Sequence, residues 1–485
     1  TTARRRPDRS VQSPGMPQPE WAVVLPPVLA IVLAIATRQV YLSLATGILA
    51  GCTILAGWNP LRGLAQTVEE AVIVLGDAGN ARVVLFTLII GALIATIEAS
   101  GGVAGFVRRL EARRLVSGPR TAGLLVFFIG VVIFIESNIT ILVSGAVGRP
   151  LFDRLKLSRE RLAYLVDSTS APICMLIPLN AWGALVLGLL AKNGVQQPVG
   201  TLLASIPLNF YAIFALILAG LTAAFQVTIG PMRRAERRTQ SGEVLWANAQ
   251  PMIDSDVLSP PHTTRIPPRA INMLLPVLVL VVAMPLSLLA TGNGDIRAGS
   301  GSTSVLWSVL LALATAWIML LAQRAFTVEQ LVRLGLKGAG GLVSLALILI
   351  LALALANVAN RLGTGAYIAR ATAGTFPNAV FLPLIFIVSA IVAFCTGTSW
   401  GTFALMIPIA VPTAITLGLP PAPFAAAVLS GGVFGDHASP ISDTTILSSM
   451  ASATDHVDHV RTQLPYALVA GALATVAFAI TGAML

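Results

Sequence analysis

The stretch IFIESNITILVSGAVGRP (133–150) decides the fold of this sequence, because an apolar run breaks there at a polar patch and then resumes. A second stretch, AFCTGTSWGTFALMIPIAVP (393–412), has the same pattern. Backbone without helical hydrogen bonds is tolerated at membrane depth only where protein or water surrounds it. Polar breaks at matching places in two halves of a sequence are therefore typical of a binding site between repeats.

Two further pairs of segments match in the same order along the sequence. EASGGVAGFVRRL (98–110) corresponds to VANRLGTGAYIAR (358–370), with Gly105 opposite Gly365. DSTSAP (167–172) corresponds to DHASP (436–440). Matches in one order, flanked by similar apolar runs, indicate an internal duplication.

The composition excludes a soluble protein. Of the 485 residues 56% are hydrophobic and 11% are charged, and the mean hydropathy is +0.84. Soluble domains carry about 25% charged residues, and one bilayer crossing needs about 20 mostly apolar residues. Apolar runs that could cross a bilayer lie at 21–37, 39–57, 82–100, 121–135, 201–228, 271–291, 304–322, 341–359, 378–396 and 463–484. The sequence therefore predicts an all-α polytopic membrane protein, and basic residues in cytoplasmic loops account for its net charge of +10 without a nucleic-acid partner.

The domain organisation follows from one long polar interruption. We expect a polar basic tail (1–20), a first transmembrane repeat (21–229), a cytoplasmic linker loop (230–270) and a second transmembrane repeat (271–485). Each repeat is predicted to hold about five transmembrane helices, one of them broken, and a re-entrant hairpin. An odd number of crossings per half makes the repeats inverted. We expect a multi-pass protein of the cell inner (plasma) membrane, with a homodimer as one open possibility.

Acidic and hydroxyl side chains gather at the breaks. Ionisable groups inside membrane segments are costly and indicate function. Sodium is a hard cation that takes oxygen ligands, and breaks at glycine or proline free backbone carbonyls. The predicted ion- or substrate-binding residues are Glu136, Ser137, Asn138, Thr140, Asp167, Ser168, Thr169, Thr396, Thr398, Ser399, Asp436, Ser439, Ser442, Asp443 and Thr444. Among them Asp167, Asp436 and Asp443 are the predicted sodium ligands.

Other interpretations of these residues stay open. A single serine or threonine in a membrane helix is often only a packing contact. His456 and His459 have a spacing that could hold a metal, but a polar segment that senses pH is the preferred interpretation. The sequence contains no nucleotide-binding or hydrolase motif, so we expect no enzyme activity and no cofactor beyond transported or coupling sodium ions and protons.

At GDHASPISDTTILSSMASATDHVDHVRTQLPYAL (435–468) the sequence resembles the NhaC-type sodium/proton antiporter family. Residues 134–184 are similar to the first-half counterpart in that family. The resemblance implies membership of a wider ion-transporter group with inverted repeats, in which a Ser-Asn-Thr motif at a hairpin tip binds sodium and substrate. Ser137-Asn138-Ile139-Thr140 resembles this motif with one inserted residue, and Thr396, Thr398 and Ser399 form its second-half counterpart.

We therefore expect a secondary transporter that exchanges sodium for protons by alternating access. The alternative is a sodium- or proton-coupled carrier, by symport or exchange, of a small organic acid or amino acid, because relatives in the same family carry such solutes. A channel would not need two matched breaks, and a membrane enzyme would need a nucleophile and base that the sequence lacks.

Overall fold

The computed structural model describes residues 20–37, 39–102, 104–106, 109, 118–134, 136–251, 267–296, 299–372 and 377–485. Parts of the predicted tail and linker, residues 1–19 and 252–266, lie outside this set. Ile135 of the first polar break lies outside it as well.

The first half is a series of helices joined by short connections. They are η1 (Glu20–Val24), α1 (Leu25–Thr37), α2 (Val40–Leu55), α3 (Pro60–Gly76), α4 (Ala78–Ala99), α6 (Pro119–Val132), α7 (Ser137–Arg154), α8 (Arg159–Ser168), α9 (Ala171–Leu176), α10 (Ala181–Lys192), α11 (Pro198–Ser205), η2 (Ile206–Leu208) and α12 (Phe210–Phe225). The predicted linker begins with another helix, α13 (Pro231–Gln240).

The second half repeats this order of elements. Its helices are α15 (Ile271–Thr291), α16 (Gly301–Ala322), α17 (Val328–Gly341), α18 (Val343–Leu362), α19 (Thr364–Thr372), α20 (Asn378–Thr396), α21 (Ser399–Thr416), α22 (Pro421–Ala438), α23 (Asp443–Ser452) and α24 (His456–Ala483). The pair α20–α21 corresponds to α6–α7, and α22–α23 corresponds to α8–α10. The element order thus agrees with the duplication seen in the sequence.

Seven of the described helices are long and apolar enough to cross a membrane, or up to nine if each of two bent pairs is one span. The bent pairs join Arg159–Leu176 to Ala181–Lys192 at 42° and Pro198–Leu208 to Phe210–Phe225 at 44°. The prediction of an all-α polytopic membrane protein is confirmed. The inversion of the two repeats stays a prediction.

Local signals set the helix boundaries. At the start of α3, Asn59 Oδ1 accepts a hydrogen bond from Arg62 N at 3.1 Å, and Pro60 occupies the first helical position. At the start of α17, Thr327 and Gln330 form a capping box. Both helices are amphipathic, and each precedes a long apolar helix in its half, so the same local pattern appears twice.

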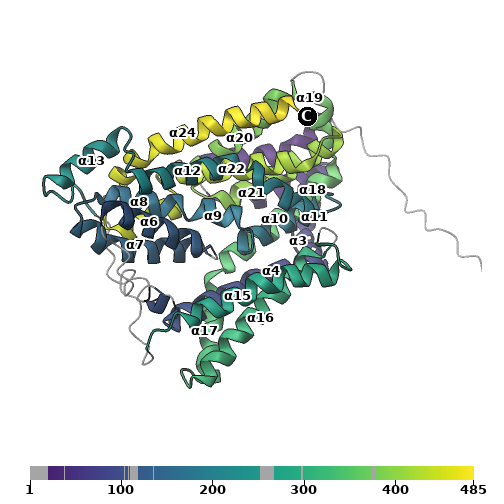
Figure 1. Ribbon diagram of the computed structural model, residues 1–485. Helices are drawn as coiled ribbons and strands as arrows, with labels where there is room; N and C mark the ends of the chain where they lie inside the picture. Colours follow the sequence, from purple (N-terminus) through teal and green to yellow (C-terminus); the bar gives the residue numbers. More distant parts are fainter. Residues whose placement is uncertain are drawn as a thin grey trace, which may run out of the picture.

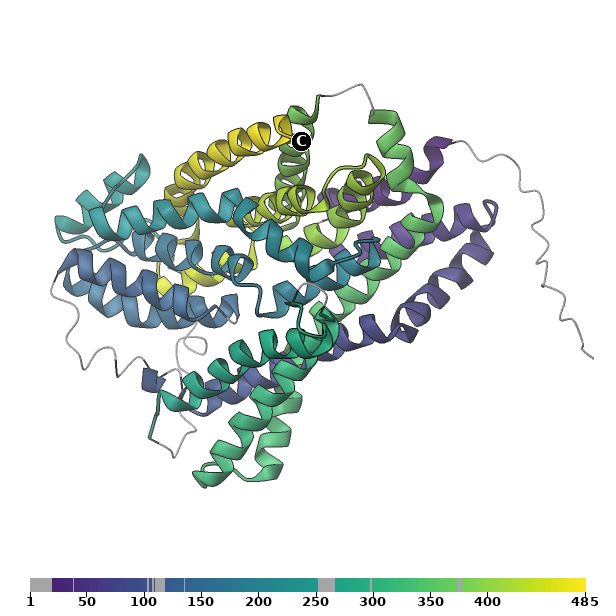
Figure 2. The same ribbon diagram turned by 45° about the vertical axis from the view of Figure 1, so that its right-hand side comes forward.

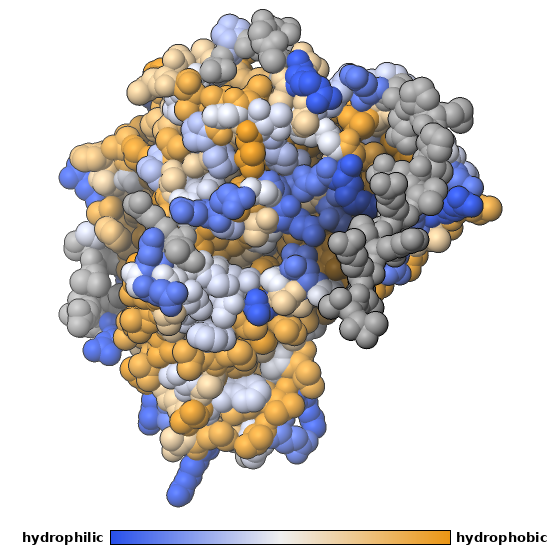
Figure 3. Space-filling view, turned by 90° about the vertical axis from the view of Figure 1, so that its right-hand side faces the viewer, coloured by the Kyte–Doolittle hydropathy of each residue, from blue (hydrophilic) through white to orange (hydrophobic). Residues whose placement is uncertain are grey.

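The helices form a body and a projecting arm. In Figures 1 and 2, α15 and α16 lie side by side and pack with α4 and α17 below the body, while α24 lies along its opposite edge. Apolar residues cover much of the surface in Figure 3, as expected where lipid replaces water as solvent. The largest buried cluster runs through both halves.

The two hairpins contact the opposite halves reciprocally. α7 of the first half packs against α23 of the second, and α21 of the second half packs against α10 of the first. At the first contact a Cβ added to Gly145 would lie 2.6 Å from Ala451 Cβ, and at the second the rings of Trp182 and Trp400 are 4.9 Å apart. Each hairpin therefore packs against the helix that follows the second break of the other half.

Candidate functional site

The first hairpin tip, between α6 and α7, is tied to the second break of its own half. The carbonyl of Phe134 accepts hydrogen bonds from Asn180 Nδ2 at 3.0 Å and from Cys174 Sγ at 3.3 Å. Asn180 also caps α10, because its Oδ1 accepts from the backbone of Trp182 and Gly183. One side chain thus fixes both the tip and the start of the helix beyond the break.

The second hairpin tip, between α20 and α21, repeats this contact with different residues. The carbonyl of Phe394, which matches Phe134 in the sequence, accepts from Ser439 Oγ at 2.7 Å. Gly397 turns the tip with a φ of +68°, and a Cβ added there would lie 2.5 Å from the carbonyl oxygen of Ile441. A glycine is required at this position both for its left-handed conformation and for the close approach.

Asp436 lies near the end of α22 and is 1% exposed. Its Oδ2 accepts a hydrogen bond from Ser399 Oγ at 3.1 Å, and its Oδ1 accepts from Ser442 Oγ at 2.7 Å. The Ser442 hydroxyl is also 3.0 Å from Thr444 Oγ1. Asp436 therefore joins the hairpin tip to the helix beyond the break, and all of these donors belong to its own half.

Asp167 occupies the corresponding place on α8 and is also 1% exposed. Its Oδ2 accepts from Gln463 Nε2 at 2.6 Å and from Thr445 Oγ1 at 3.2 Å, so both donors come from the other half. Its Oδ1 is buried and has no hydrogen-bond partner among the described residues. A buried, unpartnered carboxylate oxygen is costly, and a cation or a proton would satisfy it.

His437 lies between the two acids. Its Nε2 is 3.1 Å from Ser168 Oγ and 4.0 Å from Asp167 Oδ2, and its Nδ1 is 2.7 Å from the hydroxyl of Tyr211. Its carbonyl accepts from Gln463 Nε2 at 2.7 Å. Because His437 follows Asp436 directly, one polar network extends from the second hairpin tip to Asp167.

The structure places the predicted residues in three groups. Six belong to this network: Asp167, Ser168, Ser399, Asp436, Ser442 and Thr444. Four donate their hydroxyl groups to backbone carbonyls: Thr140, Thr169, Thr396 and Ser439. The rest lie at the hairpin tips or at the start of α23: Glu136, Ser137, Asn138, Thr398 and Asp443.

Asp443 differs from the other two predicted sodium ligands. It is the first residue of α23, it is exposed, and its Oδ1 accepts from the backbone nitrogen of Thr444 at 2.9 Å. It lies seven residues after Asp436, but none of the hydrogen bonds described above joins the two carboxylates. Its role as a ligand stays a prediction.

The predicted site residues did not include Thr445, Gln463 or Tyr211. Thr445 and Gln463 stand inside the segment that resembles the antiporter family, and Gln463 follows His459 by one helical turn, which places both on one face of α24. Tyr211 had no such signal, because nothing in its local sequence distinguishes it from a packing aromatic residue.

No described lysine or arginine forms an ion pair with Asp167 or Asp436. The buried Arg161, on the same helix as Asp167, donates to the carbonyl of Thr222 and lies 3.8 Å from Glu236. Within the described ranges no group of three or more His, Cys, Asp or Glu could hold a metal ion. A cation at this site would therefore need hydroxyl and carbonyl oxygens beside the two carboxylates.

Most of the chain matches known proteins. The model of the Na+/H+ antiporter family matches residues 185–483. An uncharacterized protein of Haemophilus influenzae is 34% identical over 95% of this chain and 91% of its own. The malate-2H(+)/Na(+)-lactate antiporter of Bacillus subtilis is 37% identical over 22% of each chain. The YdaH transporter of Alcanivorax borkumensis has a similar fold, with a TM-score of 0.59, 15% identity and coverage of 86% of this chain and 88% of its own.

Proposed function

Because this chain belongs to the Na+/H+ antiporter family and is a multi-pass membrane transporter, we propose that it exchanges sodium ions for protons by alternating access. The observation that carries the proposal is the buried Oδ1 of Asp167, which makes no hydrogen bond with a described residue. It lies in the network that joins the two halves of the molecule.

The chemistry of the network suits a small cation. Sodium takes oxygen ligands, and the neighbourhood offers the carboxylates of Asp167 and Asp436 and the hydroxyl groups of Ser168 and Thr445. No fixed positive charge is paired with either carboxylate in the described part of the chain. An incoming cation would therefore meet uncompensated negative charge.

Exchange follows if sodium and a proton compete for the same carboxylate. An oxygen that binds one of them cannot bind the other, so each ligand weakens the other by linkage. In the pH range where Asp167 is mostly protonated, the apparent sodium affinity should fall by about tenfold for each unit of acidification. A transporter that uses sodium only to drive an organic solute makes no such demand.

Alternating access is supported by the burial of the site. Asp167 and Asp436 are each 1% exposed, so an ion can reach either carboxylate only after the surrounding helices move. Donors to Asp167 come from α23 and α24, while the carboxylate itself is on α8. A relative movement of the two halves would therefore open the site and change its ligands together. We place this activity in the cell inner (plasma) membrane.

A second candidate is a sodium- or proton-coupled carrier of a small organic acid or amino acid. It is favoured by the similarity of one fifth of the chain to the malate-2H(+)/Na(+)-lactate antiporter. In that case the polar amides and hydroxyls near the hairpin tips would hold the solute, because the described site contains no arginine or lysine paired with its acids.

The deciding experiment is reconstitution in liposomes with a pH-sensitive dye inside and no organic solute present. An inward sodium gradient should raise the internal pH, because each entering sodium ion expels protons. Asp167→Asn, which keeps the side-chain volume and removes the charge, should abolish the response. A response that appears only after malate, lactate or an amino acid is added would favour the second candidate.

A further inference from the structure

A series of hydrogen bonds connects Asp167 to a histidine at the start of α24. Gln463 Oε1 is 2.9 Å from His459 Nε2, His459 Nδ1 is 2.8 Å from Ser449 Oγ, and Ser449 Oγ is 3.0 Å from His456 Nδ1. His459 is fully buried, whereas His456 is half-buried. The series, defined as His456, Ser449, His459, Gln463 and Asp167, thus runs from the edge of the protein to the candidate ion site.

The neighbours of Gln463 fix the direction of its amide. Its Nε2 faces the carboxylate of Asp167 and the carbonyl of His437, and a carbonyl can only accept. The amide nitrogen must therefore be on that side, and Oε1 faces His459. It follows that His459 Nε2 carries a hydrogen and that neutral His459 has a bare Nδ1.

The same reasoning applies to His456. Its Nε2 is 2.6 Å from the carbonyl oxygen of Pro440, so Nε2 carries the hydrogen and Nδ1 of the neutral ring is bare. The single hydrogen of Ser449 then faces three acceptors: two bare nitrogens and the carbonyl of Thr445 at 2.8 Å. With both rings neutral, one imidazole nitrogen has no donor.

One added proton resolves this conflict. If it binds His456 Nδ1, that nitrogen donates to Ser449 Oγ, and the Ser449 hydroxyl is free to donate to His459 Nδ1. Every donor in the series then points toward Asp167. Hydrogen bonds in such a sequence polarise and strengthen one another.

We infer that His456 Nδ1 is a proton-binding site linked through Ser449, His459 and Gln463 to the carboxylate of Asp167. The proton is the ligand, and it binds at the edge of the protein instead of at the ion site. This inference rests on the proposed function only for its consequence, which is a second, indirect influence of pH on sodium binding. Because an amide does not readily relay protons, the series transmits a change in hydrogen bonding and leaves the proton on His456.

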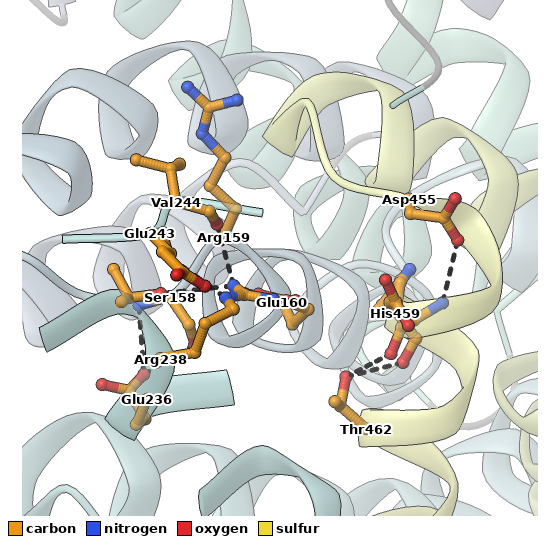
Figure 4. A network of polar contacts seen from close by, with 12 residues as sticks. Ser158, Arg159, Glu160, Glu236, Arg238, Glu243, Val244, Asp455, His459 and Thr462 are labelled. Atoms are coloured by element: carbon orange, nitrogen blue, oxygen red, sulfur yellow. Dashed lines mark hydrogen bonds and ion pairs between the residues drawn. The ribbon is translucent and has the colours of Figure 1, made fainter. Parts of the chain in front are cut away.

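Charged groups surround His456 on several elements. On α24, Asp455 caps the helix through Val457 N and Asp458 N, and Gln250 N donates to the same carboxylate. Figure 4 shows this first turn of α24 beside the ion pair of Arg238 with Glu160. The charged and titratable groups of this region are Asp153, Arg159, Glu160 and Asp167 near or on α8, Arg238 on α13, Asp436 and His437 on α22, Asp443 on α23, and Asp455, Asp458, His459 and Arg461 on α24.

Two pairs of these neighbours compensate one another. Glu160 is paired with Arg238, and Arg159 is paired with Asp153 while also donating to the carbonyl of Ala453. Among the described residues, neither Asp455 nor Asp458 at the start of α24 forms an ion pair. A positive charge is normally unfavourable at a helix N-terminus, and these two carboxylates offset that cost for His456.

The test is nitrogen NMR of the full-length protein, with labelled histidine, titrated from about pH 9 to pH 5, where histidines commonly change charge. Signals are assigned with His456→Asn and His459→Asn. His456 should gain a proton, and the Nδ1 signal of His459 should shift at the same pH because it acquires the Ser449 hydrogen. In Ser449→Ala this coupled shift of His459 should be lost. Ser452→Ala, on the same helix and without a hydrogen-bond partner for its Oγ among the described residues, is the matched control.

Two results would overturn the inference: a His456 that stays neutral over the whole range, or a His459 signal that moves equally in the unmodified protein and in Ser449→Ala. The titration needs no transport assay. It therefore tests the inference even if the protein does not exchange sodium for protons. If exchange is present, its pH profile should lose one titration step in His456→Asn. Asparagine does not titrate, so it offers no binding site for the added proton at any pH.

Discussion

The acids of the two halves stand at matching places but are held differently. Both oxygens of Asp436 accept hydrogen bonds from serines of its own half, Ser399 and Ser442. Asp167 depends on Thr445 and Gln463 of the other half and keeps one oxygen without a partner among the described residues. Of the two polar breaks, one therefore has its acid hydrogen-bonded within its own half, and the other has its acid hydrogen-bonded by donors from the other half. We expect Asp436 to fix the structure of the site and Asp167 to bind the exchanging ion.

The largest expected effect is that of Asp167→Asn. Removing the charge with little change in volume should reduce sodium-driven proton flux by roughly 100-fold or more, because the proposed ion ligand is lost. Each tenfold loss corresponds to about 1.4 kcal/mol. Flux is measured in liposomes containing equal amounts of protein, with expression and monodispersity checked by gel filtration. Asp443→Asn is the matched comparison, because Asp443 is an exposed residue whose Oδ1 accepts from the backbone of Thr444. A loss equal to that of Asp167→Asn would make Asp443 an essential residue of the mechanism.

A smaller effect is expected for Ser442→Ala. The change leaves Oδ1 of Asp436 without its donor at 2.7 Å, and a buried unsatisfied group costs about 1–3 kcal/mol. We expect the apparent sodium affinity to fall by about tenfold. If Ser442→Ala abolished transport while the Asp167→Asn variant still transported, the roles that we assign to Asp436 and Asp167 would be wrong.

Gly397→Ala tests the hairpin tip itself. Alanine would be strained at a φ of +68°, and its Cβ would also meet the Ile441 carbonyl at 2.5 Å. Gly418→Ala is a matched control, because Gly418 has a φ of +71° but no atom within 4 Å of an added Cβ. Left-handed strain alone costs about 1–2 kcal/mol. Thermal unfolding in detergent should therefore show a larger drop in Tm for Gly397→Ala than for Gly418→Ala, and equal drops would mean that the close approach does not matter.

The inversion of the repeats can be tested without disturbing function. Arg154 and Thr416 end α7 and α21 and are exposed, so Arg154→Cys and Thr416→Cys should react with an impermeant reagent from opposite sides of the membrane. The background lacks Cys52, Cys174 and Cys395, with serine at 174 to keep a donor to the Phe134 carbonyl. Labelling of both positions from one side would indicate parallel repeats.

Much of the fold could be predicted because its signals are local. The apolar runs, the polar breaks at 133–150 and 393–412 and the matched acids Asp167 and Asp436 are all visible in the printed sequence. The membrane environment makes these signals strong, since an apolar run of about 20 residues has few alternatives to a spanning helix.

The partners of these residues could not be predicted in the same way. Asp167 is joined to Gln463 across 296 residues and to Thr445 across 278, and the donor that completes a carboxylate depends on how helices from different halves cross. The reciprocal packing of α7 on α23 and of α21 on α10 has no counterpart in local sequence pattern.

The sequence by itself determined that this is an all-α membrane protein, and it predicted two repeats with an acid at a polar break in each half. Only the tertiary structure decided that Asp436 is satisfied by its own half and that Asp167 keeps a buried oxygen without a described partner. The physical reason is that hydrophobicity and helix-breaking residues act over a few turns of chain, whereas hydrogen-bond satisfaction in a buried site depends on distances between segments that packing alone sets.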